Sequence, residues 1–87
     1  MMYKCPCCGN YTLKALPEIA IAYICPVCCW ENDVFIKSAD EPSDENGGMT
    51  LTEAQINYRQ FGAVRESFIK YTRSPTFEEK HGINDNS

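Results

Sequence analysis

The sequence has one histidine, one tryptophan and no long apolar run, and each shortage disfavours a class of protein. His81 stands alone in a polar C-terminal stretch, so the chain lacks the histidine ligands of most catalytic zinc sites. The most apolar run, residues 19–24, has the length of a strand and is far shorter than the roughly 20 residues of a membrane-spanning helix. We therefore expect neither a histidine-based enzyme nor a membrane protein.

Basic residues are also scarce, since eight Lys and Arg stand against twelve Asp and Glu, giving a net charge of -4. The acidic excess lies in residues 31–50, whereas residues 51–75 are mildly basic. A protein that neutralises phosphates usually carries a net positive charge. The charge thus disfavours nucleic acid as a partner, although tyrosines and arginines suited to such a role are present.

The six cysteines are the abundant feature of a chain of only 87 residues. A domain this short buries a small core and needs an additional staple, either disulfides or a metal. The first residues enter a cysteine motif without the apolar run of a secretory signal, so we expect a cytoplasmic, reducing location. In that compartment, closely spaced cysteines bind metal more often than they form disulfides.

Two Cys-Pro-x-Cys units, the knuckles, are separated by sixteen residues, which is the spacing of a four-cysteine zinc site. The predicted ligands are Cys5, Cys8, Cys25 and Cys28. Gly9 follows the first knuckle and permits the positive φ that such a turn often requires. Four thiolates leave no open coordination position, so we predict one structural Zn²⁺.

Cys7 and Cys29 are left over, and each lies beside a predicted ligand. Their simplest role is to pack as small apolar side chains. Two alternatives stay open from the sequence: the two thiols form a redox-sensitive pair near the metal, or one of them replaces a neighbour as ligand.

The hydrophobic pattern predicts a small α+β domain with a zinc-ribbon-like β-hairpin, followed by one or two short C-terminal α-helices. The hairpin strands are expected at residues 10–13 and 19–24, with a third short strand at 34–36. We expect residues 1–77 to form one zinc-binding domain, composed of a ribbon (1–36), an exposed acidic loop (37–49) and a helical part (50–73), followed by a polar tail (78–87).

The helical part begins with a capping box, because Thr50 and Glu53 can each bond the other's backbone amide. Gly62 is expected to end the first helix. A second helix is expected to end near Thr72, since the residue before Pro75 is pushed out of helical geometry.

The Cys-Pro-Cys-Cys-Gly sequence at 5–9, the Cys-Pro-Val-Cys-Cys-Trp-Glu-Asn-Asp sequence at 25–33 and the Gly-Gly and Thr-Leu-Thr-Glu-Ala sequences at 47–54 resemble the cysteine-rich CPCC family. The resemblance covers about residues 3–64 and implies a small, mostly bacterial, zinc-binding protein with no activity to carry over. Family members usually place an aromatic residue where this chain has Cys29, so the resemblance assigns Cys29 no role.

The preferred functional hypothesis is a protein–protein interaction module, for example a small inhibitor or an immunity-like factor. An acidic loop would steer a basic partner. The alternatives are a nucleic-acid-binding zinc ribbon and a rubredoxin-like redox protein, while catalysis by the carboxylates of 31–33 is less favoured. Trp30 is predicted to cover the metal or, alternatively, to contact the partner. The residues considered for partner contact are Trp30, Glu31, Asp33, Asp40, Glu41, Asp44 and Glu45.

Overall fold

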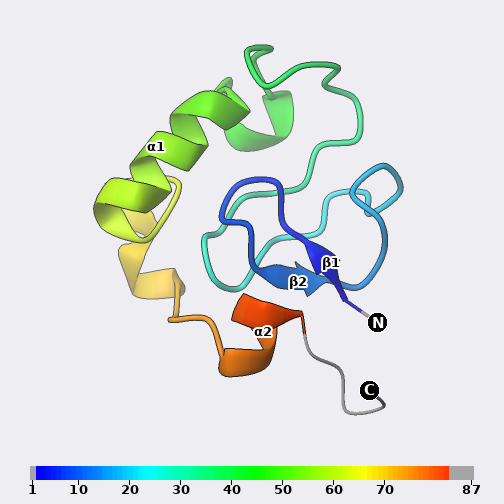
Figure 1. Ribbon diagram of the computed structural model, residues 1–87. Coiled ribbons are helices and arrows are strands. Elements are labelled where there is room, and N and C mark those ends of the chain that lie inside the picture. The colour runs from blue at the N-terminus through cyan, green and yellow to red at the C-terminus, as the bar shows by residue number, and fades with distance from the viewer. Residues whose placement is uncertain (1, 83–87) are drawn as a thin grey trace.

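The computed structural model describes residues 2–82 and has the predicted small α+β architecture (Figure 1). A two-stranded antiparallel hairpin is followed by short helices. The strands are β1 (Tyr3–Lys4) and β2 (Tyr11–Leu13), and the α-helices are α1 (Leu51–Phe61) and α2 (Phe77–His81). Two 3-10 helices, η1 (Asp44–Asn46) and η2 (Glu66–Tyr71), lie before and after α1.

The hairpin encloses the first knuckle instead of connecting the two knuckles. Tyr3 pairs with Leu13 and Lys4 with Tyr11, so the chain between the paired strands carries the first cysteine pair. Only the part of the predicted first strand at 11–13 is therefore confirmed, and its partner lies before the knuckle.

The predicted strand at 19–24 is wrong, because this segment forms successive turns. The amides of Ile19 and Ala20 both donate to the carbonyl of Leu16, and Ala22 has a φ of 55°, which interrupts an extended chain. Ile19 and Ile21 are 64% and 69% exposed, so their alternation with alanine does not mark a buried face.

A short antiparallel ladder nevertheless surrounds the second knuckle. The Cys25 amide donates to the Trp30 carbonyl, and the Asn32 amide donates to the Tyr23 carbonyl. Ile24 and Glu31 form the bridge between these bonds. The predicted strand at 34–36 is absent from the described chain, where these residues form a bend and irregular chain.

The first helix has the predicted ends. Thr50 and Glu53 form the complete capping box, and Gly62 ends α1 with a φ of 79°. The second predicted helix is instead the 3-10 helix η2, after which Thr72 is extended.

A second capping box, formed by Thr76 and Glu79, begins α2, and this helix replaces the first residues of the polar tail predicted at 78–87. α2 packs against β2, and a Cβ at Gly82 would lie 2.8 Å from the Tyr11 ring. Residues 83–87 of the predicted tail lie outside the described residues.

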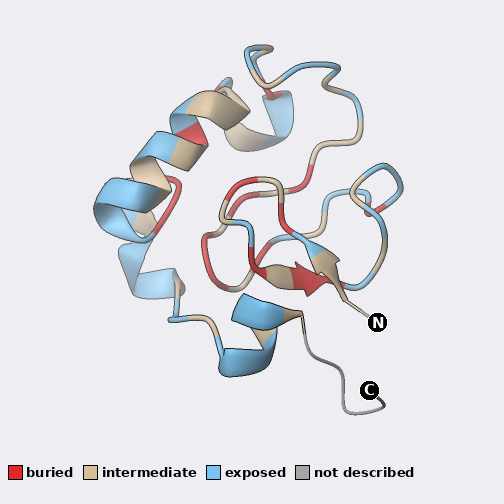
Figure 2. Cartoon of the chain, in the orientation of Figure 1, coloured by how far each residue is buried: buried red, intermediate tan, exposed pale blue. Residues whose placement is uncertain are grey.

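The buried residues concentrate in the loops that carry the two knuckles (Figure 2). α1 lies along one side of these loops, and α2 lies below β2 (Figure 1). No helix in the described part of the chain is both long enough and apolar enough to cross a bilayer.

Candidate metal centre

The two knuckles have the same backbone geometry. In the first, the Gly9 amide donates to the Cys5 carbonyl at 2.8 Å; in the second, the Cys29 amide donates to the Cys25 carbonyl at 2.8 Å. Gly9 has a φ of 77° and Cys29 a φ of 71°. Cys29 therefore occupies the left-handed position that the first knuckle gives to glycine, one residue beyond the predicted ligand Cys28.

The predicted ligands come together at one point. The Sγ atoms of Cys5, Cys8, Cys25 and Cys28 all lie within 4.8 Å of one another. The Cys5–Cys28 and Cys8–Cys25 Sγ distances are 3.7 and 3.8 Å. A tetrahedron with Zn–S bonds of about 2.3 Å has edges of about 3.8 Å. The four cysteines lie close enough to bind one metal ion, and the donor set matches a single structural zinc.

Two neighbouring groups bond the sulfurs of the second knuckle. The Trp30 amide donates to Cys28 Sγ at 3.4 Å, and the buried Thr12 hydroxyl lies 3.1 Å from Cys25 Sγ. Such bonds disperse the negative charge of thiolate ligands and orient them around the metal. The ladder and β2 thus position the second pair of ligands.

The close approach of the four thiols lowers the pKa of two of them and raises the pKa of the other two. Hydrogen bonds from the Cys28 and Cys5 thiols lower the pKa of Cys25, and the presence of the Cys25 thiolate raises the pKa of Cys28 and of Cys5. Four thiolates at this spacing require a cation, because like charges in a buried cluster are strongly destabilising. A divalent ion supplies that cation and also closes the coordination sphere.

α1 and the chain after it hold both knuckles. Gln55 Nε2 donates to the Pro6 carbonyl at 2.9 Å, and the Val64 amide donates to the Cys28 carbonyl at 2.9 Å. Asn57 Nδ2 in turn donates to the Val64 carbonyl at 2.8 Å. Gln55 therefore connects α1 directly to the first knuckle, and Asn57 positions the segment whose Val64 amide bonds the second knuckle.

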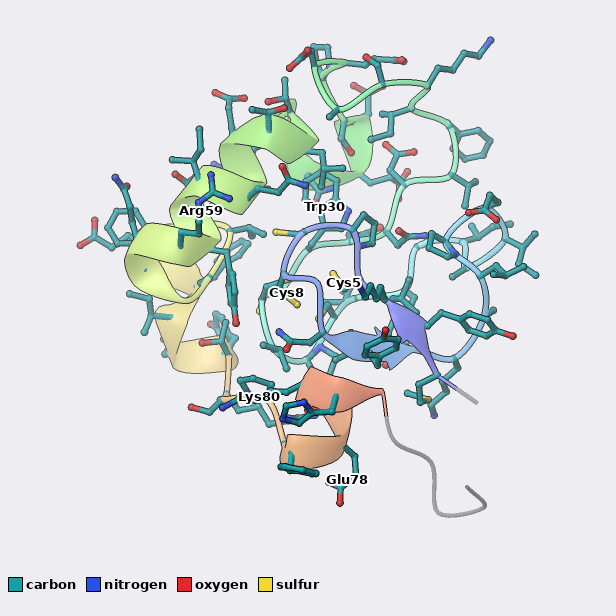
Figure 3. The ribbon with its side chains drawn as sticks, viewed as in Figure 1. Cys5, Cys8, Trp30, Arg59, Glu78 and Lys80 are labelled. Carbon is teal, nitrogen blue, oxygen red and sulfur yellow. The ribbon has the colours of Figure 1, made fainter. Side chains whose placement is uncertain are left out.

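Trp30 is 1% exposed and packs in the core with the ligand cysteines. This position agrees with the prediction that Trp30 covers the metal site. It does not agree with the alternative that Trp30 contacts a partner. Figure 3 shows Trp30, Cys5 and Cys8 together between α1 and the hairpin.

The two remaining cysteines differ in their surroundings. Cys7 is buried at the position that Val27 takes in the other knuckle, and both side chains belong to the core. Cys29 is half-buried, and burial raises the pKa of its thiol. Neither belongs to the four-sulfur cluster of the described residues. Packing explains both positions, and the redox hypothesis stays a prediction.

The predicted acidic loop contains a turn that is attached to the second knuckle. Asn46 accepts a hydrogen bond from the Glu31 amide at 2.9 Å and donates to the Glu31 carbonyl at 2.8 Å. The buried Ser43 hydroxyl donates to Asp33 at 2.7 Å. Residues 43–49 are thus anchored on the metal-binding part, a contact that composition alone does not reveal.

Several acidic residues considered for partner contact bond within the chain. Asp33 accepts from the Phe35 amide as well as from Ser43. Asp40 accepts from the Thr52 hydroxyl, and Glu41 accepts from the Lys37 amide. Glu31 and Glu45 instead line a common groove, and Asp44 is exposed.

The family model described as Cysteine-rich CPCC matches residues 3–79, nearly the whole chain. No curated protein and no solved structure matches the sequence. The matched range includes both knuckles, the anchored turn and all of α1.

Proposed function

We propose that this chain, which belongs to the cysteine-rich CPCC family, is a small zinc-binding protein that acts as a protein–protein interaction module. The observation that carries the proposal is the closed four-sulfur site. Four thiolates satisfy the metal, so it offers no position for water or substrate. The metal then serves to fix the fold, and recognition falls to the surface.

The surface supports this role through its exposed apolar side chains. Ile21, Phe35 and Tyr71 are each at least 65% exposed, although the chain is small and its buried core is limited. Tyr71 lines a common groove with Ile24 and Phe68, and neighbouring apolar and aromatic side chains at the surface are typical of protein contact sites. A small inhibitor or immunity-like factor is the form of this role that we favour, because a rigid, acidic module suits a basic target.

The test is photo-crosslinking from single exposed positions of the zinc-loaded chain. We would place the crosslinking residue at Ile21, Tyr71 or Phe77, and at Arg59 on the outer face of α1 as the control. A discrete protein adduct from one apolar position, absent from the control, is expected. The captured protein should form a complex of fixed stoichiometry with the purified chain.

Two results would contradict the interaction role. The first is the absence of a protein adduct from every position. The second is an adduct that nuclease removes and that increasing salt disrupts, which would indicate the nucleic-acid alternative.

A further inference from the structure

One groove of about 570 Å³ lies beside the second knuckle. It is bounded by the bridge at residues 24–31, by the anchored turn at 43–49 and by the chain from 64 to 71. Its volume falls in the range of pockets that hold a small ligand or a few side chains. We call it the knuckle groove and define it by Ile24, Glu31, Glu45, Met49, Phe68 and Tyr71.

The knuckle groove combines an apolar interior with an acidic edge. Met49 is buried, Phe68 is half-buried, and Tyr71 is 65% exposed, so the apolar lining extends from the core to the surface. At the edge, Glu31 and Glu45 both line the groove. Apolar side chains and a cation would both find complementary surfaces here.

The arginine at the groove does not cancel the acidic edge. Arg65 Nη2 donates to the Asn46 carbonyl at 2.9 Å and lies against Gly47, where a Cβ would be only 2.9 Å away. Its guanidinium is thus engaged with the backbone of the turn. With two carboxylates and one arginine, the charge of the lining favours a cationic ligand over an anionic one.

We propose that the knuckle groove binds an extended segment of a partner protein in which apolar residues alternate with lysine or arginine. The apolar side chains enter against Met49, Phe68 and Tyr71, and a cationic side chain bridges Glu31 and Glu45. This inference rests on the proposed interaction role and names the surface and the chemistry of the partner. Both carboxyl groups line the groove, and the neighbouring Glu45 carboxyl raises the pKa of Glu31, as expected for two like charges that would gain from a shared cation.

The experiment titrates synthetic peptides into the isotopically labelled, zinc-loaded full chain and follows amide resonances by NMR. The probes are three hexapeptides, alternating leucine with lysine, leucine with glutamate, and serine with lysine. We expect the leucine–lysine peptide to shift groove resonances and to bind at least tenfold more tightly than either of the others.

Two double variants separate the groove from general charge attraction. Glu31→Gln with Glu45→Gln removes the acidic edge, and Asp44→Asn with Glu78→Gln removes the same net charge at exposed positions that do not line the groove. We expect the first double variant to weaken binding at least tenfold and the second to change it less than twofold. Tyr71→Ser, at an exposed position, should weaken the leucine–lysine peptide severalfold.

Several outcomes would overturn the groove assignment. These are equal binding to both double variants, equal or tighter binding of the leucine–glutamate peptide, shifts confined to the Ile19–Ile21 surface, or no binding of any peptide up to about 1 mM. If photo-crosslinking captures a protein that the Glu31→Gln, Glu45→Gln variant binds as well as the original chain does, the interaction role stands and only the groove assignment fails. If the peptide binds as expected but no protein is captured, the interaction role fails instead.

Discussion

At the residue scale, the left-handed positions after the knuckles are the sharpest constraint. Gly9 has open space where a Cβ would lie, so Gly9→Ala changes only the backbone preference. A non-glycine residue in this conformation costs about 1 kcal/mol, and we expect that loss in the free energy of unfolding. In a domain of this size such a loss lowers Tm by about 4–8 °C, which calorimetry of the zinc-loaded protein measures.

Cys29 provides the matched comparison, because it has the same backbone conformation without being glycine. Cys29→Gly should leave the free energy of unfolding unchanged or slightly higher. Glycine adopts the positive φ without strain, which stabilises the folded chain, and its greater freedom in the unfolded chain opposes this gain. Cys29→Val should lower it by about 1–2 kcal/mol. An equal loss in both variants would show that the thiol itself matters, as the redox and alternate-ligand hypotheses require.

Glu31 gives a prediction for pH dependence. The neighbouring Glu45 carboxyl, together with burial, raises the pKa of Glu31 in the folded chain. Ionisation of Glu31 therefore lowers the free energy of unfolding. This loss is complete at pH values above the pKa of the folded chain and disappears at pH values below the pKa of the unfolded chain. Glu31→Gln removes the repulsion between the two carboxylates and should raise Tm at pH 7.5. The expected gain in the free energy of unfolding is about 0.2–1 kcal/mol, the usual size of an interaction between exposed charges. The advantage should shrink as pH falls toward 4.5, the ordinary pKa of a glutamate, and Asp44→Asn is the control at an exposed position outside the groove.

At the element scale, α1 and the chain after it hold the two metal-binding loops in place through hydrogen bonds to backbone carbonyls, an arrangement that we call the clamp. Gln55→Ala and Asn57→Ala each remove a side-chain bond to a backbone carbonyl, which is worth about 1 kcal/mol. We expect each variant to lower Tm and to release zinc faster to a chelator, followed with a colorimetric zinc indicator. Gln60→Ala is the control, because Gln60 is exposed on the same helix. Equal release from all three variants would refute the clamp.

The sequence predicts local features of this fold better than contacts between distant residues. The ligand spacing and the Thr50 cap are local patterns, and both were predicted correctly from the chain alone. Residues 19–24 were not, because the turn at Leu16 keeps residues 19–21 out of an extended strand, and pairing is limited to the short ladder that begins at Ala22. The anchoring of Asn46 on Glu31 joins residues fifteen positions apart, so no local signal identifies it.

At the scale of the whole molecule, the fold depends on a core that is itself largely the metal site. Among the described residues, the buried apolar set contains Cys5, Cys25 and Cys28 but only a few large side chains, such as Leu13 and Trp30. A core of this size stabilises a small domain weakly, whereas binding of structural zinc contributes on the order of 10 kcal/mol. The metal should therefore decide whether the chain folds.

Elemental analysis of the purified protein and thermal melting with and without chelator test this dependence. We expect one zinc per chain and loss of the cooperative transition after zinc removal. Cys25→Ser should behave like the chelated protein, whereas Cys7→Val should retain one zinc, because valine occupies the equivalent buried position in the second knuckle. Iron in place of zinc, a second metal, or a chelated chain that still melts cooperatively would each contradict the prediction. Iron would favour the rubredoxin-like alternative, and loss of metal from Cys7→Val would make Cys7 part of the site.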